Sequence, residues 1–176
     1  MSWSSAAPRA SRRALLALLL LPLAGCGFHP LYSQREEAID EPALASIKIS
    51  PIKDRIGQML EFELRESLNP RGIHVETRYR LVVALQVIRT DLGIERDAAS
   101  SRARVDVIAS FVLADANNGA PVYRGTTATT SAFNITDDAY AAQVAEDDAR
   151  ARTVRDLTDE IRTRLSLFLR RERLAG

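Results

Sequence analysis

The sequence predicts an α+β domain in which two helices pack on one side of a four-stranded mixed β-sheet, in the order β-α-β-β-β-α. Apolar residues alternate with polar ones in several segments, and in two others they recur every three or four residues. Of the 176 residues, 46% are hydrophobic and 27% are charged, with a formal net charge of +1. This balance is typical of a globular protein, so we expect one compact domain over residues 46–176.

The first strand and the first helix are predicted between residues 47 and 68. Ile47 and Ile49 alternate with polar residues, and Pro51 ends this short strand. Asp54 can cap the helix that follows. The apolar positions of the helix recur at helical spacing: Ile56, Met59, Leu60, Leu64 and Leu68. The segment Asn69-Pro70-Arg71-Gly72 then stops it.

Three further strands are predicted between residues 79 and 133. Tyr79 to Thr90 has apolar residues on both faces, which indicates a central strand covered on both sides. The segment from Arg104 has one fully apolar face: Val105, Val107, Ala109, Phe111 and Leu113. Asn118-Gly119 predicts a turn that joins this strand to the last one, residues 122–133. The threonines of the last strand indicate that one of its faces is polar.

A long helix is predicted after residue 136. Thr136 is a good N-cap, and Asp137 and Asp138 are placed to favour the helix dipole. The helical pattern continues to Phe168 and beyond, and about 35 residues make about 50 Å of helix. Because a helix links the first two strands, they can pair in parallel through a right-handed crossover, while the other strands form an antiparallel meander.

Residues 1–25 are typical of a secretory signal peptide. Three arginines precede an apolar stretch from Ala14 to Leu23, and two small residues follow. An apolar run of about ten residues is too short for a lasting membrane helix, which needs about 20. We therefore expect residues 1–25 to be removed.

The only cysteine follows this segment directly. Leu23-Ala24-Gly25-Cys26 resembles the bacterial lipobox, in which the cysteine is acylated and becomes the first residue of the mature chain. The alternative is a plain signal peptide followed by an incidental thiol. Several acyl chains would hold the protein firmly at a membrane. In the lipoproteins that this resembles, a residue such as Gly27 in place of aspartate points to the outer membrane, with the body in the periplasm. Residues 26–45 are expected to be an extended tether.

Composition argues against several classes of function. Three of the 24 basic residues lie in residues 1–25, which leaves 21 against 23 acidic residues, a net charge of −2 without the basic excess of nucleic-acid binders. One cysteine excludes a disulfide framework within the chain. No phosphate-binding loop, nucleophile elbow or zinc-protease motif is present in the sequence. The acidic run at residues 146–148 is interpreted as a solvated helix face, because neighbouring helical side chains point about 100° apart. We expect no enzyme activity, no metal and no cofactor.

A basic cluster surrounds the predicted connection between the second and third strands. It contains four arginines and three acids: Arg89, Asp91, Glu95, Arg96, Asp97, Arg102 and Arg104. The planar guanidinium group suits bidentate contacts with phosphate. The other interpretation is a solvated loop with local ion pairs, because the neighbouring acids offset the charge.

Several segments together resemble the lipoprotein family LptE, which assembles lipopolysaccharide (LPS), in its alphaproteobacterial form. They follow one another in this order: Cys26-Gly-Phe-His-Pro-Leu-Tyr32, Ile47 to Gln58, Leu68-Asn-Pro-Arg-Gly72, Arg78-Tyr-Arg-Leu81, Phe133-Asn134, Tyr140-Ala141 and Ala145-Glu146-Asp147-Asp148-Ala149. Essentially the whole mature chain is covered.

The resemblance implies a plug inside the outer-membrane barrel LptD, which helps the barrel to fold and LPS to reach the outer leaflet. The implied partners are LptD, LPS and the membrane, the last through acyl chains on Cys26, and no nucleic acid. Because large barrels have polar interiors, we expect Thr127 and Thr129 of the threonine-rich strand to face the barrel wall. Family members can bind LPS through basic residues, and we assign this role to Arg96, Arg102 and Arg104.

Two other functions are weighed against this one. The chain could be an auxiliary lipoprotein of another envelope lipid-transport complex, which would lack a large β-barrel partner. It could also be a lipid or cell-wall hydrolase, which would need a nucleophile and a base in a concave site. The sequence offers no recognisable pair of this kind.

Overall fold

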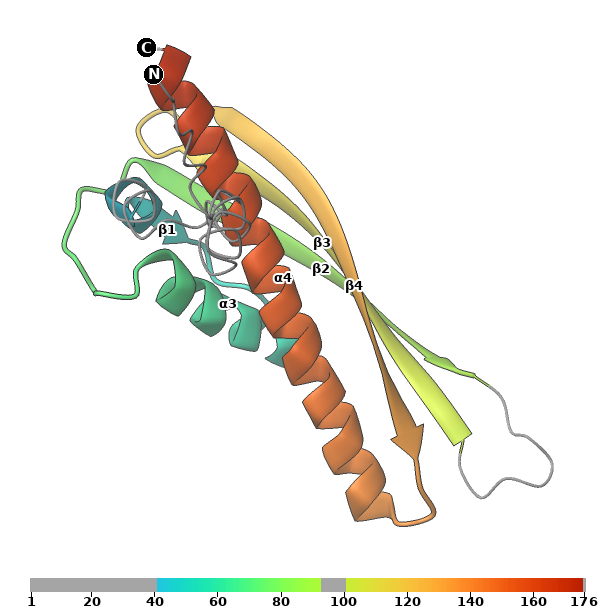
Figure 1. Cartoon of the computed structure of the whole chain (residues 1–176). Coiled ribbons are helices and arrows are strands. Elements are labelled where there is room, and N and C mark those ends of the chain that lie inside the picture. Colours follow the sequence, from blue (N-terminus) through green and yellow to red (C-terminus); the bar gives the residue numbers. More distant parts are fainter. Residues whose placement is uncertain (1–40, 93–100, 176) are drawn as a thin grey trace, which may run out of the picture. The chain divides into compact units, whose positions relative to one another are not determined.

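The computed structural model describes residues 41–92 and 101–175, and it confirms the predicted α+β class and element order (Figure 1). The elements are β1 (Ile47–Ile49), α3 (Arg55–Leu68), β2 (Tyr79–Asp91), β3 (Ser101–Asp115), β4 (Pro121–Ile135) and α4 (Ala139–Ala175). The sheet order is β1-β2-β3-β4, in which β1 is parallel to β2 and the other neighbours are antiparallel. The predicted crossover and meander are therefore both present.

Both helices lie on one face of the sheet, which we call the covered face, and the core forms beneath them (Figure 1). The apolar face predicted for β3 is confirmed, since each of its five side chains is buried against the helices. Leu81 and Val83 of β2 pair with Leu113 and Phe111 of β3 and extend this surface. Aliphatic side chains at helical spacing cover this surface: Leu60 and Leu64 in α3, and Leu157, Ile161 and Leu165 in α4. Burial of each such side chain contributes about 1.5–3 kcal/mol to folding.

The prediction that β2 is covered on both sides is wrong for this chain taken alone. The opposite face of the sheet, which we call the open face, leaves Val82 47% and Ile88 40% exposed. Ala84 and Gln86, on the same side of β2, are exposed as well. The physical reason is that α3 and α4 pack on the same side. Apolar residues on the second face of β2 therefore lie at a surface.

Gly125 permits a close aromatic contact under the C-terminal half of α4. A Cβ atom at this position would collide with the ring of Phe111, the residue that pairs with Gly125 across the sheet. The Phe111 ring packs against the ring of Tyr123, with 6.0 Å between the ring centroids. The Tyr123 ring in turn stacks on Phe168 of α4, with 5.0 Å between the centroids. This aromatic series ties β3, β4 and α4 together.

The starts of both helices differ from the prediction. Asp54 precedes α3, but its side chain makes no capping hydrogen bond and its φ of 68° is unusual for a residue other than glycine. At α4, Asp138 takes the cap position predicted for Thr136. Its Oδ1 accepts hydrogen bonds from the backbone N–H groups of Tyr140 (2.8 Å) and Ala141 (3.1 Å). A carboxylate at this position satisfies unpaired donors and also carries the charge that a helix N-terminus favours.

The strand β4 has one neighbour in the sheet, and α4 reaches along it. Arg164 Nη1 donates to the Thr126 carbonyl at 3.1 Å, and Arg152 Nη2 donates to the Ala132 carbonyl at 3.5 Å. Two arginines of the helix thus bind the backbone of the edge strand.

At least part of the segment predicted as a tether packs on the domain. Residues 41–45 form a helical turn in which Leu44 is buried in the core. Glu41, at the start of this turn, forms an ion pair with Arg71. No helix in the described ranges is long and apolar enough to cross a membrane.

Candidate functional site

Two of the three predicted ligand residues lie at the end of the domain where β2 ends and α4 begins, which we call the distal end. Arg102 and Arg104 are both on the open face of β3. Arg102 is exposed and its Nε donates to Asn134 Oδ1 at 3.3 Å. Arg104 Nε lies 2.9 Å from Asp106 Oδ2, so an acid on its own strand balances its charge. Arg96 lies outside the described residues, as does the predicted lipid-attachment residue Cys26.

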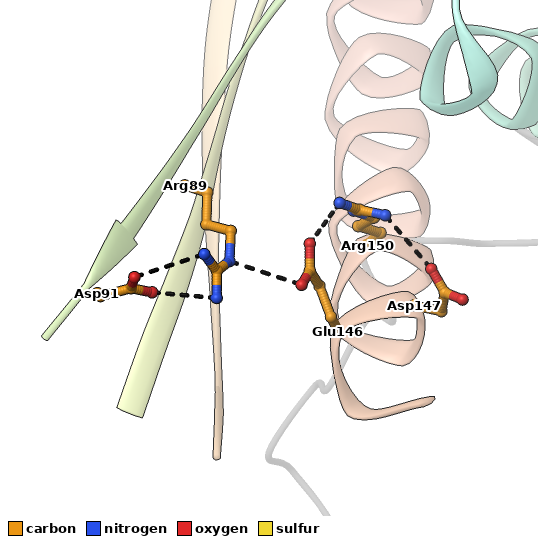
Figure 2. Close-up of polar contacts among 5 residues, drawn as sticks. All are labelled: Arg89, Asp91, Glu146, Asp147 and Arg150. Carbon is orange, nitrogen blue, oxygen red and sulfur yellow. Dashed lines mark hydrogen bonds and ion pairs between the residues drawn. The ribbon is translucent and has the colours of Figure 1, made fainter. Parts of the chain in front are cut away.

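The structure separates Arg89 from these two arginines. Arg89 pairs with Val105 across the sheet and so lies on the covered face, where it meets α4 (Figure 2). Its Nη2 lies 3.1 Å from Asp91 Oδ1, and its Nε lies 3.5 Å from Glu146 Oε2. The basic cluster of the sequence is therefore divided between the two faces of the sheet.

Glu146 is the centre of an ion-pair network that joins β2 to α4 (Figure 2). Besides Arg89, it binds Arg150, whose Nη1 lies 3.4 Å from Asp147 Oδ1. The Glu146 side chain is only 15% exposed. The interpretation of the acidic run as a solvated face is therefore wrong for Glu146, because it lies between the sheet and the helix. We call these five residues, Arg89, Asp91, Glu146, Asp147 and Arg150, the distal network.

A shallow groove of about 520 Å³ lies beside this network. Arg102 of β3 and Arg152 of α4 both line it, with Asn134, Thr136 and Asp148. Alanines 132, 141 and 145 and Phe133 supply its apolar wall. Arg152, which no local pattern in the sequence marks as a site residue, forms an ion pair with Asp148 one helical turn away. The groove brings two guanidinium groups from distant parts of the chain to one amphipathic surface.

Thr127 and Thr129 do not face the open side of the sheet. Thr127 is 8% exposed and lies on the covered face, and Thr129 Oγ1 donates to the Thr153 carbonyl of α4 at 3.4 Å. The open face of β4 instead presents Thr126, Ala128 and Thr130. Thr130 Oγ1 donates to Asp106 Oδ1 at 2.7 Å, which adds a polar pair to that face. On β4, the side that α4 leaves exposed is therefore formed by the neighbouring positions and not by Thr127 and Thr129.

The open face also holds a groove of about 490 Å³ near the other end of the sheet. Val82, Ala84, Ser110 and Val112 line it on one side, and Arg124, Gly125 and Thr126 on the other, with Phe111 between them. The mixture of aliphatic, hydroxyl and cationic groups suits a protein surface better than a small apolar ligand. In the part of the chain that the structure describes, no three metal-ligating side chains gather closely enough to hold an ion.

Comparisons with known proteins identify the family and support the fold of the chain. The model of the family LptE, described as lipopolysaccharide-assembly, matches residues 44–165, which is more than half of the chain. The crystal structure of a candidate lipoprotein from Caulobacter crescentus CB15 aligns with a TM-score of 0.60 and 25% identity, covering 76% of this chain and 97% of that one. A minor lipoprotein from Acinetobacter baumannii aligns with a TM-score of 0.53 and 15% identity, covering 69% and 88%, and shares the fold. Comparison with curated proteins gave no match.

Proposed function

The chain belongs to the LptE lipopolysaccharide-assembly family. On this basis we propose that it is an outer-membrane lipoprotein that plugs the LPS-translocon barrel LptD. In this role it helps the barrel to assemble and LPS to enter the outer leaflet. The observation that carries the proposal is the open face, a broad sheet surface that the chain's own helices leave exposed in a member of this family. Family membership also supports a non-catalytic role.

Acylation of Cys26 would attach the protein to the inner leaflet of the outer membrane. The cysteine follows an apolar leader and small residues, as the lipobox requires. Each buried methylene contributes about 0.8 kcal/mol, so several chains anchor a protein where one holds it only marginally. The body of the protein then lies on the periplasmic side of the membrane and can enter a barrel through its periplasmic opening.

The chemistry of the open face suits the inside of a large barrel. Barrel interiors are polar and wet, so a plug needs hydrogen-bonding groups more than a continuous apolar surface. Thr126 and Thr130 of β4 and Ser110 of β3 place hydroxyl groups on this face, while Val82 and Ile88 add limited apolar area.

Photocrosslinking tests this orientation. A photoreactive amino acid at Thr126, Ala128 or Thr130 should capture a large β-barrel protein in membranes. Asp159 on the exposed side of α4 and Phe62 on α3 serve as matched positions away from the sheet. Capture from the two helix positions together with none from β4 would contradict the orientation. If the protein purifies without any barrel partner, the proposal is contradicted. That result would favour the alternative of an auxiliary lipoprotein of another envelope lipid-transport complex.

LPS binding is proposed for the distal end. Arg102 forms no ion pair with a carboxylate of the described residues, whereas Arg104 is held by Asp106. Arg102 is therefore expected to contribute more than Arg104 to binding of phosphate groups. Arg96 stays in the assignment as a prediction from the sequence.

Substitution of these arginines tests the assignment. The Arg96→Gln/Arg102→Gln/Arg104→Gln variant should bind LPS more weakly at low ionic strength, and most of the loss should follow Arg102→Gln alone. The control removes three exposed arginines elsewhere: Arg55, Arg65 and Arg155. Equal affinity of the two triple variants would reject the site.

A further inference from the structure

The last two turns of α4 carry an exposed stripe that nothing in the proposed role explains. Leu174 is 83% exposed and Leu167 is 47% exposed. They are seven residues apart, which places them about 20° from each other around the helix axis. Arg170 and Arg171 lie between them along the same side of the helix. We call Leu167, Arg170, Arg171 and Leu174 the basic-leucine stripe, and Arg173 flanks it about 100° from Leu174 around the helix axis.

The opposite side of these turns is fixed to the domain, so the stripe has a set direction. Leu169 is buried, and Glu172 Oε2 accepts a hydrogen bond from the Tyr79 hydroxyl at 2.7 Å. Burial and the hydrogen bond to Glu172 raise the pKa of Tyr79, so the hydroxyl keeps its proton well above neutral pH. Helix and sheet therefore hold the leucines of the stripe away from the core.

The charge of the stripe differs from that of the turns before it. Asp156, Asp159 and Glu160 lie on the outward side of the middle of α4, where they are exposed or half-buried. The basic residues gather at the end of the helix, where Arg78 and Arg173 also line a groove of about 350 Å³. Leucines between arginines on one side of a helix are typical of segments that lie in a membrane interface, where the cations meet lipid phosphates.

The beginning of the described chain lies at this same end of the domain, which we call the proximal end. Ala43 lines the groove with Leu169, Glu172 and Arg173. Glu41 lies fifteen positions after Cys26, and such a segment spans at most about 50 Å when fully extended. An acyl anchor on Cys26 would therefore keep the proximal end close to the bilayer and raise its effective concentration there.

From the stripe and its position we propose that the end of α4 lies on an anionic phospholipid surface, with Leu167 and Leu174 in the interface and the arginines at the phosphates. The proposal rests on the lipid anchor of the proposed function for the proximity of the membrane, and on the stripe for the contact. The protein then has two attachments to the membrane: the acyl chains and the helix end.

Fluorescence of a labelled chain tests this contact. An environment-sensitive dye is attached at Leu174→Cys in the acylated protein, whose Cys26 sulfur is blocked, and the protein is placed in vesicles of phosphatidylcholine with or without phosphatidylglycerol. The emission should shift to shorter wavelength in the anionic vesicles, and 1 M salt should reverse most of the shift, because the Debye length is then about 3 Å. A dye at Thr126→Cys on the open face should show no shift.

Charge variants decide whether the arginines are responsible. The Arg170→Gln/Arg171→Gln/Arg173→Gln variant should lose most of the shift, since three arginines near an anionic surface account for about a hundredfold in binding. The control Arg55→Gln/Arg65→Gln/Arg155→Gln should keep it. An unshifted emission at residue 174, or an equal shift in both kinds of vesicle, would overturn the proposal.

The same labelling separates this inference from the lipid anchor. An acylated chain takes up one dye, whereas a chain with a free Cys26 takes up two, which would contradict the proposed anchor. In that case the Cys26→Ala/Leu174→Cys chain, mixed with anionic vesicles, tests the stripe alone. A dye shift that the three arginines control supports the stripe, and no shift rejects it.

Discussion

The two ends of α4 are attached to the sheet by different forces. At the proximal end, Tyr123 stacks on Phe168 and packs at a tilt against Phe111, and Leu169 is buried, so packing dominates. At the distal end, alanines replace large side chains along α4, and the ion pairs of Glu146 with Arg89 and Arg150 make the connection. Salt screens partly exposed ion pairs, whereas screening does not weaken apolar packing. We therefore expect local unfolding to cost less free energy at the distal end, which holds the proposed LPS arginines, than at the proximal end.

Loss of aromatic packing should give the largest effect. Phe111→Ala should lower the free energy of unfolding by about 3–5 kcal/mol, because it removes a fully buried ring and leaves a cavity beneath Gly125. Denaturant unfolding followed by circular dichroism measures this change. Phe62→Ala, at an exposed site on α3, should change stability by less than about 1 kcal/mol. Similar losses in the two variants would show that the proximal end does not depend on this packing.

Removal of the central carboxylate should loosen the distal end alone. Glu146→Gln leaves Arg89 and Arg150 without their shared acid and should cost about 1 kcal/mol, since these side chains are partly solvated. Hydrogen exchange of amides in residues 142–150 should become faster, and 1 M salt should produce part of this change in the unmodified protein. Asp156→Asn, which removes an exposed acid in the middle of α4, is the control. Faster exchange at residues 165–172 would contradict the division between the two ends.

The smallest effect should come from the hydroxyl of Tyr79. Tyr79→Phe removes the hydrogen bond to Glu172 and should cost about 1 kcal/mol or less at neutral pH. Because the folded-state pKa of Tyr79 is raised above its usual value of 10.0, the stabilisation is complete below pH 10 and is lost as pH rises above it. Unfolding measured from pH 7 to 11 should show the two proteins converging only above pH 10. A constant difference across this range would mean that the phenol does not titrate with folding.

The sequence predicts those features that depend on neighbouring residues. The alternation from Val105 to Leu113 defines the buried face of β3, because successive side chains of a strand point to opposite sides. The same rule could not decide which threonines of β4 face outward, since both faces carry them and a shift of one residue exchanges the faces. The structure resolves this through the pairing of Thr127 with Ala109.

Features that join distant parts of the chain were not predictable. Arg89 and Glu146 lie in different elements, and nothing in their local sequence indicates that they meet. The cap was misplaced for a related reason: Thr136 and Asp138 are both suitable cap residues, and only the backbone geometry selects Asp138. The apolar residues on the second face of β2 led to the wrong prediction of a strand covered on both sides, because the sequence pattern of a strand does not say on which faces of the sheet the helices pack.

The contacts of Arg152 and Arg164 with the backbone of β4 have a consequence for solubility. An edge strand of fifteen residues offers a template on which a strand of another molecule can form, and proteins commonly block such edges with charged side chains. These two guanidinium groups occupy carbonyl oxygens of residues 126 and 132, so an incoming strand would have to displace them. The long helix that closes the core therefore also hinders edge-to-edge aggregation of the sheet.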